Sequence, residues 1–165
     1  MLTGIPDGTH CFVDANIICY HIVSVPPVSA ECTLFFKRLE SRQLRATTST
    51  AVVAEAIHKV MLAEAVQKHG LDHRGLAHRL QRHRNLIANL EEHLKVATLI
   101  RAVEMQVEPM NLEILERSAH LSKTHLLLTN DALTIGTMEK LALQHLVTND
   151  DNFDSISNVT IWKPR

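Results

Sequence analysis

The sequence has few aromatic residues and no long apolar run. Phe, Trp and Tyr make up 4% of the 165 residues, so the core must be built from Leu, Ile, Val and Ala, which the hydrophobic share of 45% allows. No stretch of about 18 uncharged apolar residues is present, so no membrane span is expected. The start, MLTGIPDGTH, lacks the apolar segment of a signal peptide. We therefore expect a single cytoplasmic domain over residues 1–165.

Cysteine is also scarce. The three cysteines, Cys11, Cys19 and Cys32, form no C-x-x-C pair, their number is odd and their spacing fits no zinc site. We interpret them as small buried residues of a protein in a reducing compartment. An excess of charge of one sign is lacking as well, because the formal net charge is −1. Any binding of phosphate groups must therefore depend on a local basic patch.

Short apolar segments alternate with segments of helical character. Strands are expected at 11–14, 44–48, 106–109, 145–148 and 159–163. Helices are expected at 17–22, 28–42, 51–68, 74–95, 96–104, 111–123 and 131–144. This alternation predicts an α/β fold with a mainly parallel sheet of about five strands flanked by helices.

Local signals mark the ends of some predicted helices. Ser49 or Thr50 is a suitable N-cap for the helix at 51–68, and Gly70 marks its end. Thr129 or Asn130 is the expected cap of the helix at 131–144. The polar segment between the helices predicted at 51–68 and 96–104, about 69–95, is expected to be a helical hairpin insertion.

Four acidic residues lie far apart in the chain, each where a strand should pass into a helix. Asp14 and Asp150 follow short apolar runs, whereas Glu55 and Asp131 fall in the opening turns of predicted helices. In a parallel sheet these positions converge at the carboxyl ends of the strands. Carboxylates that share a small space raise one another's pKa, and a hard divalent cation with oxygen ligands relieves this repulsion. The sequence therefore predicts an enzyme that depends on Mg²⁺ or Mn²⁺.

The acids occur within four short motifs whose order can be compared with known families. These motifs are F-V-D-A-N-I, V-V-A-E-A-I-H-K-V, T-N-D-A-L and L-V-T-N-D-D-N-F-D. Together, and over nearly the whole chain, this ordered set resembles the PIN-domain family and within it the VapC-type toxin ribonucleases. The resemblance implies an acidic quartet of Asp14, Glu55, Asp131 and Asp150, with Asn16 and Thr148 as auxiliary residues. It also implies cleavage of RNA to a 5′-phosphate and a 3′-hydroxyl, an antitoxin partner and a homodimer.

The roles of the four acids can be divided by their position. Mg²⁺ keeps several water ligands and takes only one or two carboxylates directly. We expect Asp14 and Asp150, at rigid strand ends, to be direct ligands. Asp131 would complete the metal site through water, and Glu55 would act through water or orient the nucleophile.

One position departs from the family pattern. Asn152 stands before Phe153, where the family often has a second Asp, and it keeps an oxygen ligand but lacks the charge. Asp154 and Asp151 are near enough in sequence to compensate. Binding of one or of two metals therefore stays open, and so does a second function, a catalytically weak PIN domain that binds RNA or protein. An aspartyl-nucleophile phosphohydrolase fits less well, because D-A-N lacks the second Asp that such enzymes use.

The segment 68–84 is rich in histidine and arginine. Its histidines are His69, His73, His78 and His83, and its arginines are Arg74, Arg79, Arg82 and Arg84. The spacing does not place three histidines on one helical face, so we favour a solvated helical segment over a metal cluster. The arginines could contact an RNA backbone or form an ordinary solvent-exposed face.

Overall fold

Five short β-strands form one parallel sheet. The computed structural model describes residues 1–72 and 74–165. The strands are β1 (His10–Val13), β2 (Arg45–Ser49), β3 (Gln106–Glu108), β4 (His145–Val147) and β5 (Thr160–Trp162). They lie in the order β3-β2-β1-β4-β5, and each neighbouring pair is parallel. β1 is therefore central, which explains its apolar run: Cys11, Phe12 and Val13 are all buried. The predicted α/β class and sheet are confirmed.

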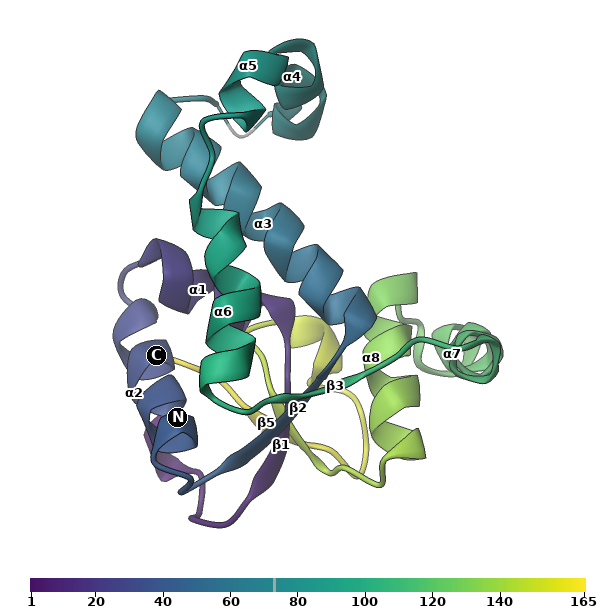
Figure 1. Cartoon of the computed structure of the whole chain (residues 1–165). Helices are drawn as coiled ribbons and strands as arrows, with labels where there is room; N and C mark the ends of the chain where they lie inside the picture. Colours follow the sequence, from purple (N-terminus) through teal and green to yellow (C-terminus); the bar gives the residue numbers. More distant parts are fainter. Residues whose placement is uncertain (73) are drawn as a thin grey trace.

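Helices cover both faces of this sheet. They are α1 (Ala15–Val23), α2 (Ser29–Glu40), α3 (Thr50–His69), α6 (Lys95–Ala102), α7 (Leu112–His125) and α8 (Thr129–Lys140). Crossovers between parallel strands are right-handed, so the connections from β1 to β2 and on to β3 put α1, α2, α3 and α6 on one face, and the return to β4 puts α7 and α8 on the other. Figure 1 shows α1, α2 and α6 on one side of the strands and α7 and α8 on the other. The winding direction therefore reverses between β1 and β4.

The helix pair on the second face packs closely. Gly136 of α8 faces α7, and a Cβ atom at this position would lie 2.6 Å from Ser118 Oγ. Ser118 is buried and its hydroxyl donates to the Ile114 carbonyl at 2.7 Å. The helices α7 and α8 can therefore approach this closely because Gly136 has no side chain.

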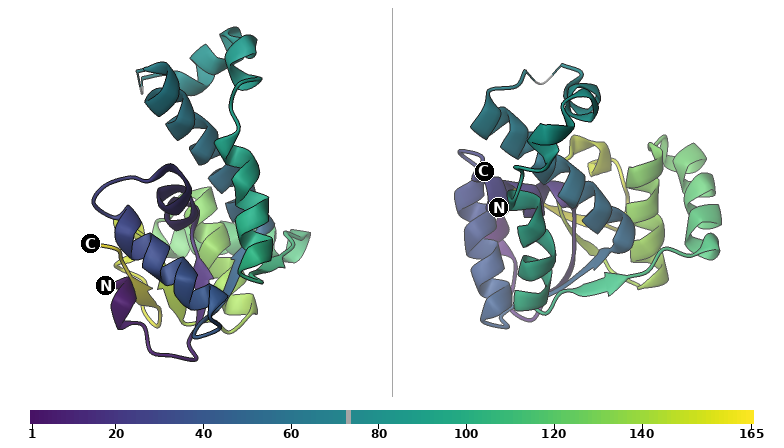
Figure 2. Two further views of the ribbon diagram at one scale, coloured as in Figure 1. Left: turned by 60° about the vertical axis from the view of Figure 1, so that its left-hand side comes forward. Right: turned by 45° about the horizontal axis from the view of Figure 1, so that its top comes forward.

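Residues 70–72 and 74–94 form a small lobe, the cap, at the far end of α3. The cap contains α4 (Leu76–Arg82), α5 (Arg84–Ile87) and the 3₁₀ turn η2 (Glu92–Leu94), and it projects beyond the sheet in every view (Figures 1 and 2). A separate apolar cluster joins it to α3, formed by Ala65, Leu76, Leu80 and Leu90. The insertion predicted at 69–95 is therefore present.

The continuous helix predicted over 74–95 is wrong. It is interrupted at His83, whose φ of −109° and ψ of 60° are not helical, and α5 ends at Ile87. A continuous helix from Leu76 to Leu90 would be about 21 Å long. At that separation Leu76 and Leu90 could not both pack in the cluster around Ala65. Because Leu90 is buried in this cluster, the chain must turn back between them.

A buried carboxylate fastens the cap to α3. The side chain of Glu64 has 0% exposure and pairs with Lys68 Nζ at 2.8 Å. It also accepts hydrogen bonds from the backbone N–H groups of Glu91 and Glu92 at 3.1 and 2.8 Å. Burial acts to raise the pKa of Glu64, but these hydrogen bonds outweigh it and hold the pKa below its ordinary value.

The predicted helix ends can be compared with the structure. Ser49 Oγ accepts from the Val52 N–H at 3.2 Å and caps α3, and Gly70 ends this helix at a φ of +62°. The cap predicted for α8 is wrong: Leu128 is the N-cap, without a side-chain hydrogen bond, and Asn130 lies inside the first turn. Within the described part of the chain, no helix has the length and apolarity needed to cross a membrane.

Candidate active site

Asp14 is the most buried of the four predicted acids. It directly follows β1, its residue exposure is 8%, and it is the N-cap of α1. Its Oδ1 accepts the Ala15 N–H at 2.6 Å and its Oδ2 accepts the Thr148 hydroxyl at 2.6 Å. The carboxylate is therefore fixed at the carboxyl end of the central strand.

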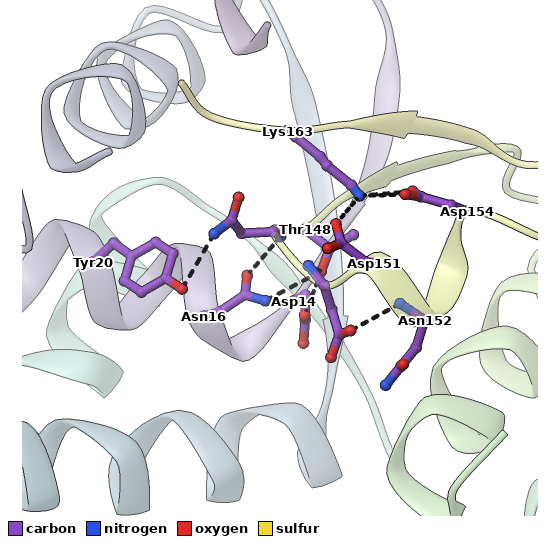
Figure 3. Close-up of polar contacts among 10 residues, drawn as sticks. Asp14, Asn16, Tyr20, Thr148, Asp151, Asn152, Asp154 and Lys163 are labelled. Carbon is purple, nitrogen blue, oxygen red and sulfur yellow. Dashed lines mark hydrogen bonds and ion pairs between the residues drawn. The ribbon is translucent and has the colours of Figure 1, made fainter. Parts of the chain in front are cut away.

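Thr148 connects the ends of β1 and β4. Besides donating to Asp14, its hydroxyl oxygen accepts the Asn16 side-chain amide at 3.2 Å and the Asp150 backbone N–H at 3.0 Å. Asn16 in turn accepts the Asn149 N–H at 3.2 Å. Figure 3 shows Asp14, Asn16 and Thr148 side by side. This contact lies where the winding reverses, which is the usual binding crevice of an open α/β sheet.

Glu55 lies at the second turn of α3 and is 26% exposed at its side chain. Its Oε1 pairs with Lys59 Nζ at 2.8 Å, one turn along the same helix, and its Oε2 accepts the Asn130 side-chain amide from α8 at 3.1 Å. The helices on opposite faces of the sheet are therefore joined above its carboxyl edge.

Asp131 and Asp150 are connected by Asn152. The backbone N–H of Asn152 donates to Asp150 Oδ1 at 2.9 Å, and its side-chain amide donates to Asp131 Oδ2 at 3.2 Å. Asp150 caps the 3₁₀ turn η3 (Asp151–Phe153) that carries Asn152. The amide thus holds together two acids that come from α8 and from the end of β4.

The electrostatics indicate that the acids share one region. Burial raises the pKa of Asp14, and the charge of Glu55 raises it further, while the Thr148 hydrogen bond and the Lys59 charge oppose the shift. Burial also raises the pKa of Asp131, and the charges of Asp150 and Glu55 add to it, against the hydrogen bond from Asn152. Repulsion between like charges therefore links all four acids.

The Lys59 ammonium responds to the same field. Its burial acts to lower its pKa, but the hydrogen bond and charge of Glu55 and the charge of Asp14 outweigh this, and the pKa lies above its ordinary value. Lys59 is therefore a resident cation beside the acids.

Asp154 does not join this group by any contact in the structure. Lys163 Nζ lies 2.7 Å from Asp154 and 2.6 Å from Asp151 (Figure 3). Both carboxylates are exposed and neutralised by this lysine. The idea that they compensate for Asn152 therefore finds no contact to support it.

The arginines of the His/Arg-rich segment lie on the cap rather than among the acids. Arg74, Arg82 and Arg84 are exposed. Arg79 hydrogen-bonds the Arg74 carbonyl and lies 3.8 Å from Asp72. The predicted histidines His69, His78 and His83 are also exposed, whereas His73 lies outside the described residues.

The donor set fits a hard divalent cation in its chemistry. Asp14, Asp150 and Asp131 supply carboxylate oxygens, and Asn152 an amide oxygen, which are the ligand types that Mg²⁺ and Mn²⁺ prefer. Burial is the main cause of the raised pKa values of Asp14 and Asp131, and the charges of neighbouring acids add a repulsion that such an ion would relieve. Over residues 1–72 and 74–165, no three His, Cys, Asp or Glu side chains are grouped closely enough to hold one ion. The acids instead hydrogen-bond to the neutral hydroxyl of Thr148 and the amide of Asn152.

Comparison with known families agrees with this geometry. The sequence matches the PIN domain over residues 11–159, which includes all four acids. The chain belongs to the PIN domain family. The resemblance predicted from the four motifs is therefore confirmed, and the sheet edge described above is the part of this PIN domain where the family motifs meet.

The chain is also similar to named proteins over most of its length. The chain is 21% identical to Ribonuclease VapC2 of Methanocaldococcus jannaschii over 150 residues, which cover 91% of each protein. VapC20 of Mycobacterium tuberculosis, a sarcin-ricin loop cleaving toxin, aligns with a TM-score of 0.60 and 16% identity over 88% of this chain and 93% of that one. VapBC2 from Rickettsia felis, bound to a promoter DNA fragment, aligns with a TM-score of 0.59 and 15% identity over 94% and 99%. At these identities the structural likeness shows a shared fold.

Two residues of the site were missed by the sequence reasoning. Lys59 had a usable signal, because it follows Glu55 by four residues and such a pair faces one side of a helix. Asn130 had none beyond its place before Asp131, because its partner Glu55 is 75 residues away.

Proposed function

We propose that this PIN domain is a metal-dependent endoribonuclease that hydrolyses RNA phosphodiesters and acts as the toxin of a toxin–antitoxin pair. The observation that carries the proposal is the contact through Thr148 between Asp14 and the chain at Asp150, at the point where the winding reverses. Glu55 and Asp131 approach the same edge from the two helix layers, and the charge of Glu55 adds to the raised pKa of both Asp14 and Asp131. The likeness to Ribonuclease VapC2 supports RNA as the substrate.

Each residue has a separate role in this proposal. Asp14 and Asp150 would be direct ligands of Mg²⁺ or Mn²⁺, with Asp131 bound through water. A bound divalent ion would supply charge neutralisation and a more acidic water. Thr148 holds Asp14 in place, and Asn152 orients Asp131. Glu55, held between Lys59 and Asn130, is the remaining carboxylate that can accept a proton from attacking water.

An antitoxin partner belongs to the same proposal. Structures with this fold include VapBC2 from Rickettsia felis and a toxin–antitoxin complex from Klebsiella pneumoniae, which aligns with a TM-score of 0.52 and 19% identity over 91% of this chain and 95% of that one. We propose that this chain also pairs with an antitoxin. The homodimer and the cytoplasmic location stay predictions.

A second function, an RNA- or protein-binding module with little catalysis, is favoured by one observation. The side-chain amide of Asn152 already donates a hydrogen bond to Asp131, and it carries no charge. Asp151 and Asp154, which could supply charge, are paired with Lys163. The metal affinity of the site decides between the two functions.

The decisive experiment measures cleavage of labelled RNA during a Mg²⁺ or Mn²⁺ titration. We expect metal-stimulated cleavage that Asp14→Asn lowers about 1,000-fold, as befits the loss of several kcal/mol of transition-state stabilisation. Asp7→Asn is the matched control, because Asp7 is exposed and paired with Arg38 away from the site. Tight RNA binding without cleavage under either ion would support the binding module instead.

A further inference from the structure

The lysines near the acids already form ion pairs with carboxylates, so other cations must attract the phosphate groups of RNA. Nine of the 17 Lys and Arg side chains form ion pairs, Lys59 and Lys163 among them. The acidic edge itself repels phosphate groups. Net attraction must therefore come from cations elsewhere on the surface.

The cap carries a concentrated set of free cations. Arg74, Arg82 and Arg84 are exposed, and no carboxylate among the described residues lies within ion-pair distance of them. Residues 69–84 contain four arginines and one aspartate, although the whole chain has a formal net charge of −1. With Glu91 and Glu92 included, residues 70–94 have a formal charge of +1 (four arginines against three acids) and the rest of the chain has −2, so the cations of the cap are concentrated around α4 and α5.

A groove extends from Asn16 and Lys59, at the site of the acids, to the first residues of α4 in the cap. It has a volume of about 680 Å³, and its lining includes Asn16 and Lys59 beside the acids, Tyr20 of α1 along its course, and His78 on α4. Its remaining lining is mainly apolar, with Leu62 of α3 among the residues. A groove with the phenol ring of Tyr20 and apolar walls suits the bases of a single strand. Its cap end is lined by the start of α4, and Arg82 lies at the end of the same helix.

We propose that the cap is a second RNA contact, which holds a single-stranded segment that runs from the scissile phosphate along α3 to Arg82 and Arg84. This inference rests on the proposed ribonuclease function and deepens it by naming the substrate class. From Glu55 to His69 the helix rises about 21 Å, which a single strand with duplex-like stacking spans in about six nucleotides, at one phosphate per ~3.4 Å. RNAs shorter than this reach the acids but not the cap.

The test separates binding from cleavage. RNA binding is measured by fluorescence anisotropy with EDTA present, using labelled single strands of about 4 and about 20 nucleotides and a duplex of the longer sequence. The cap variant is Arg82→Gln/Arg84→Gln. The control is Arg101→Gln/Lys123→Gln. It removes two exposed cations, on α6 and α7, that form no ion pair with the described residues, and it gives the same net charge as the cap variant. Thermal melting of both variants verifies that they fold.

The expected result is specific to the long single strand. Loss of two phosphate contacts lowers its affinity about 10-fold at 0.1 M salt and reduces the slope of log K against log salt by about 1.4. The short strand binds unchanged, and the control shifts less than about 2-fold. In a second variant pair, Tyr20→Leu weakens the long strand about 10-fold while Tyr20→Phe does not, because only the latter keeps a ring for stacking.

Several outcomes would overturn the inference. The first is a cap variant that binds the long strand as tightly as the wild-type protein does. The second is a control variant that loses as much affinity for the long strand as the cap variant. The third is a cap variant that loses as much affinity for the duplex as for the long single strand. If wild-type protein cleaves RNA and the cap variant binds it normally, the cap inference fails while the ribonuclease proposal stands. If wild-type protein neither cleaves nor binds any of the RNAs, both fail.

Discussion

At the scale of single residues, Thr148 matters most for the geometry of the site, because its one hydroxyl group forms hydrogen bonds with three partners. Thr148→Val keeps the shape but leaves Asp14, the Asn16 amide and the Asp150 N–H each short of a hydrogen bond. We expect a loss of about 2–3 kcal/mol in unfolding free energy and a 10- to 100-fold slower cleavage, the range for a displaced catalytic group. Thr148→Ser keeps the hydroxyl and should restore most of both. Urea unfolding and initial cleavage rates measure this; equal behaviour of the two variants would contradict it.

The raised pKa of Asp14 has a consequence for stability against pH. The folded protein binds the Asp14 proton more tightly than the unfolded chain does. Its contribution to stability is therefore full below the ordinary pKa of Asp and is lost as the pH rises through the raised pKa. Asp14→Asn cannot ionise, so without divalent ions its Tm relative to wild type should increase with pH over this window and then stay constant. A difference in Tm that is flat across the window would show that the pKa is not raised.

The site residues that the sequence predicted are those with a local signal. Asp14 and Asp150 end apolar runs, and Glu55 and Asp131 open helices, so their place at the sheet edge followed from the parallel fold. The side-chain contacts did not follow. Asn130 meets Glu55, and Lys163 neutralises Asp154, only because the tertiary fold brings them together.

At the scale of elements, α8 must be placed correctly because it carries Asn130 and Asp131. Gly136→Ala puts a methyl group 2.6 Å from Ser118 Oγ and should force α7 and α8 apart, at a cost of about 1–3 kcal/mol. Ser118→Gly removes the obstructing hydroxymethyl group, so the double variant should recover part of the loss. A double-mutant cycle by urea unfolding measures the coupling. Additive effects would show that the helices do not meet at this point.

The attachment of the cap to α3 is a second prediction for an element. Glu64→Gln replaces an acceptor oxygen with a donor and should leave at least one of the Glu91 and Glu92 N–H groups unpaired, costing about 1–3 kcal/mol locally. Hydrogen exchange should accelerate in residues 76–92 while β1 stays protected. Lys68→Met is the control, since its side chain is half exposed and a solvated ion pair of this kind contributes little to stability.

The pKa of Glu64 extends that prediction to pH. Because this pKa is lowered, the stabilisation from Glu64 is present above the ordinary pKa of Glu and is lost as the pH falls through the lowered value. Cap protection in wild type should therefore decrease in acid, whereas Glu64→Gln should not show this change. Equal acid sensitivity of the two proteins would assign the effect to another group.

At the scale of the whole molecule, the repulsion among the acids predicts that metal stabilises the fold. A divalent ion at 100 times its Kd would add about 2.7 kcal/mol, which raises the Tm of a domain of this size by about 5–10 °C. EDTA should reverse the shift, and Asp14→Asn should abolish it. A wild-type Tm that does not respond to Mg²⁺ or Mn²⁺ would count against a metal site.

The overall architecture was the most predictable level. Alternating strands and helices, right-handed crossovers and four ordered motifs were enough to give the parallel sheet and its family. The cap was the least predictable part, since 74–95 looks continuously helical and the break at His83 depends on where Leu90 must be buried.

The cap has an apolar cluster of its own, apart from the main core around β1. Substitutions there are therefore buffered from the folding of the central domain. Such a lobe can diverge in sequence, or be exchanged for another of different length, while the four acids at the sheet edge keep their positions. Evolution could in this way alter the proposed RNA contact of the cap without altering the proposed metal site.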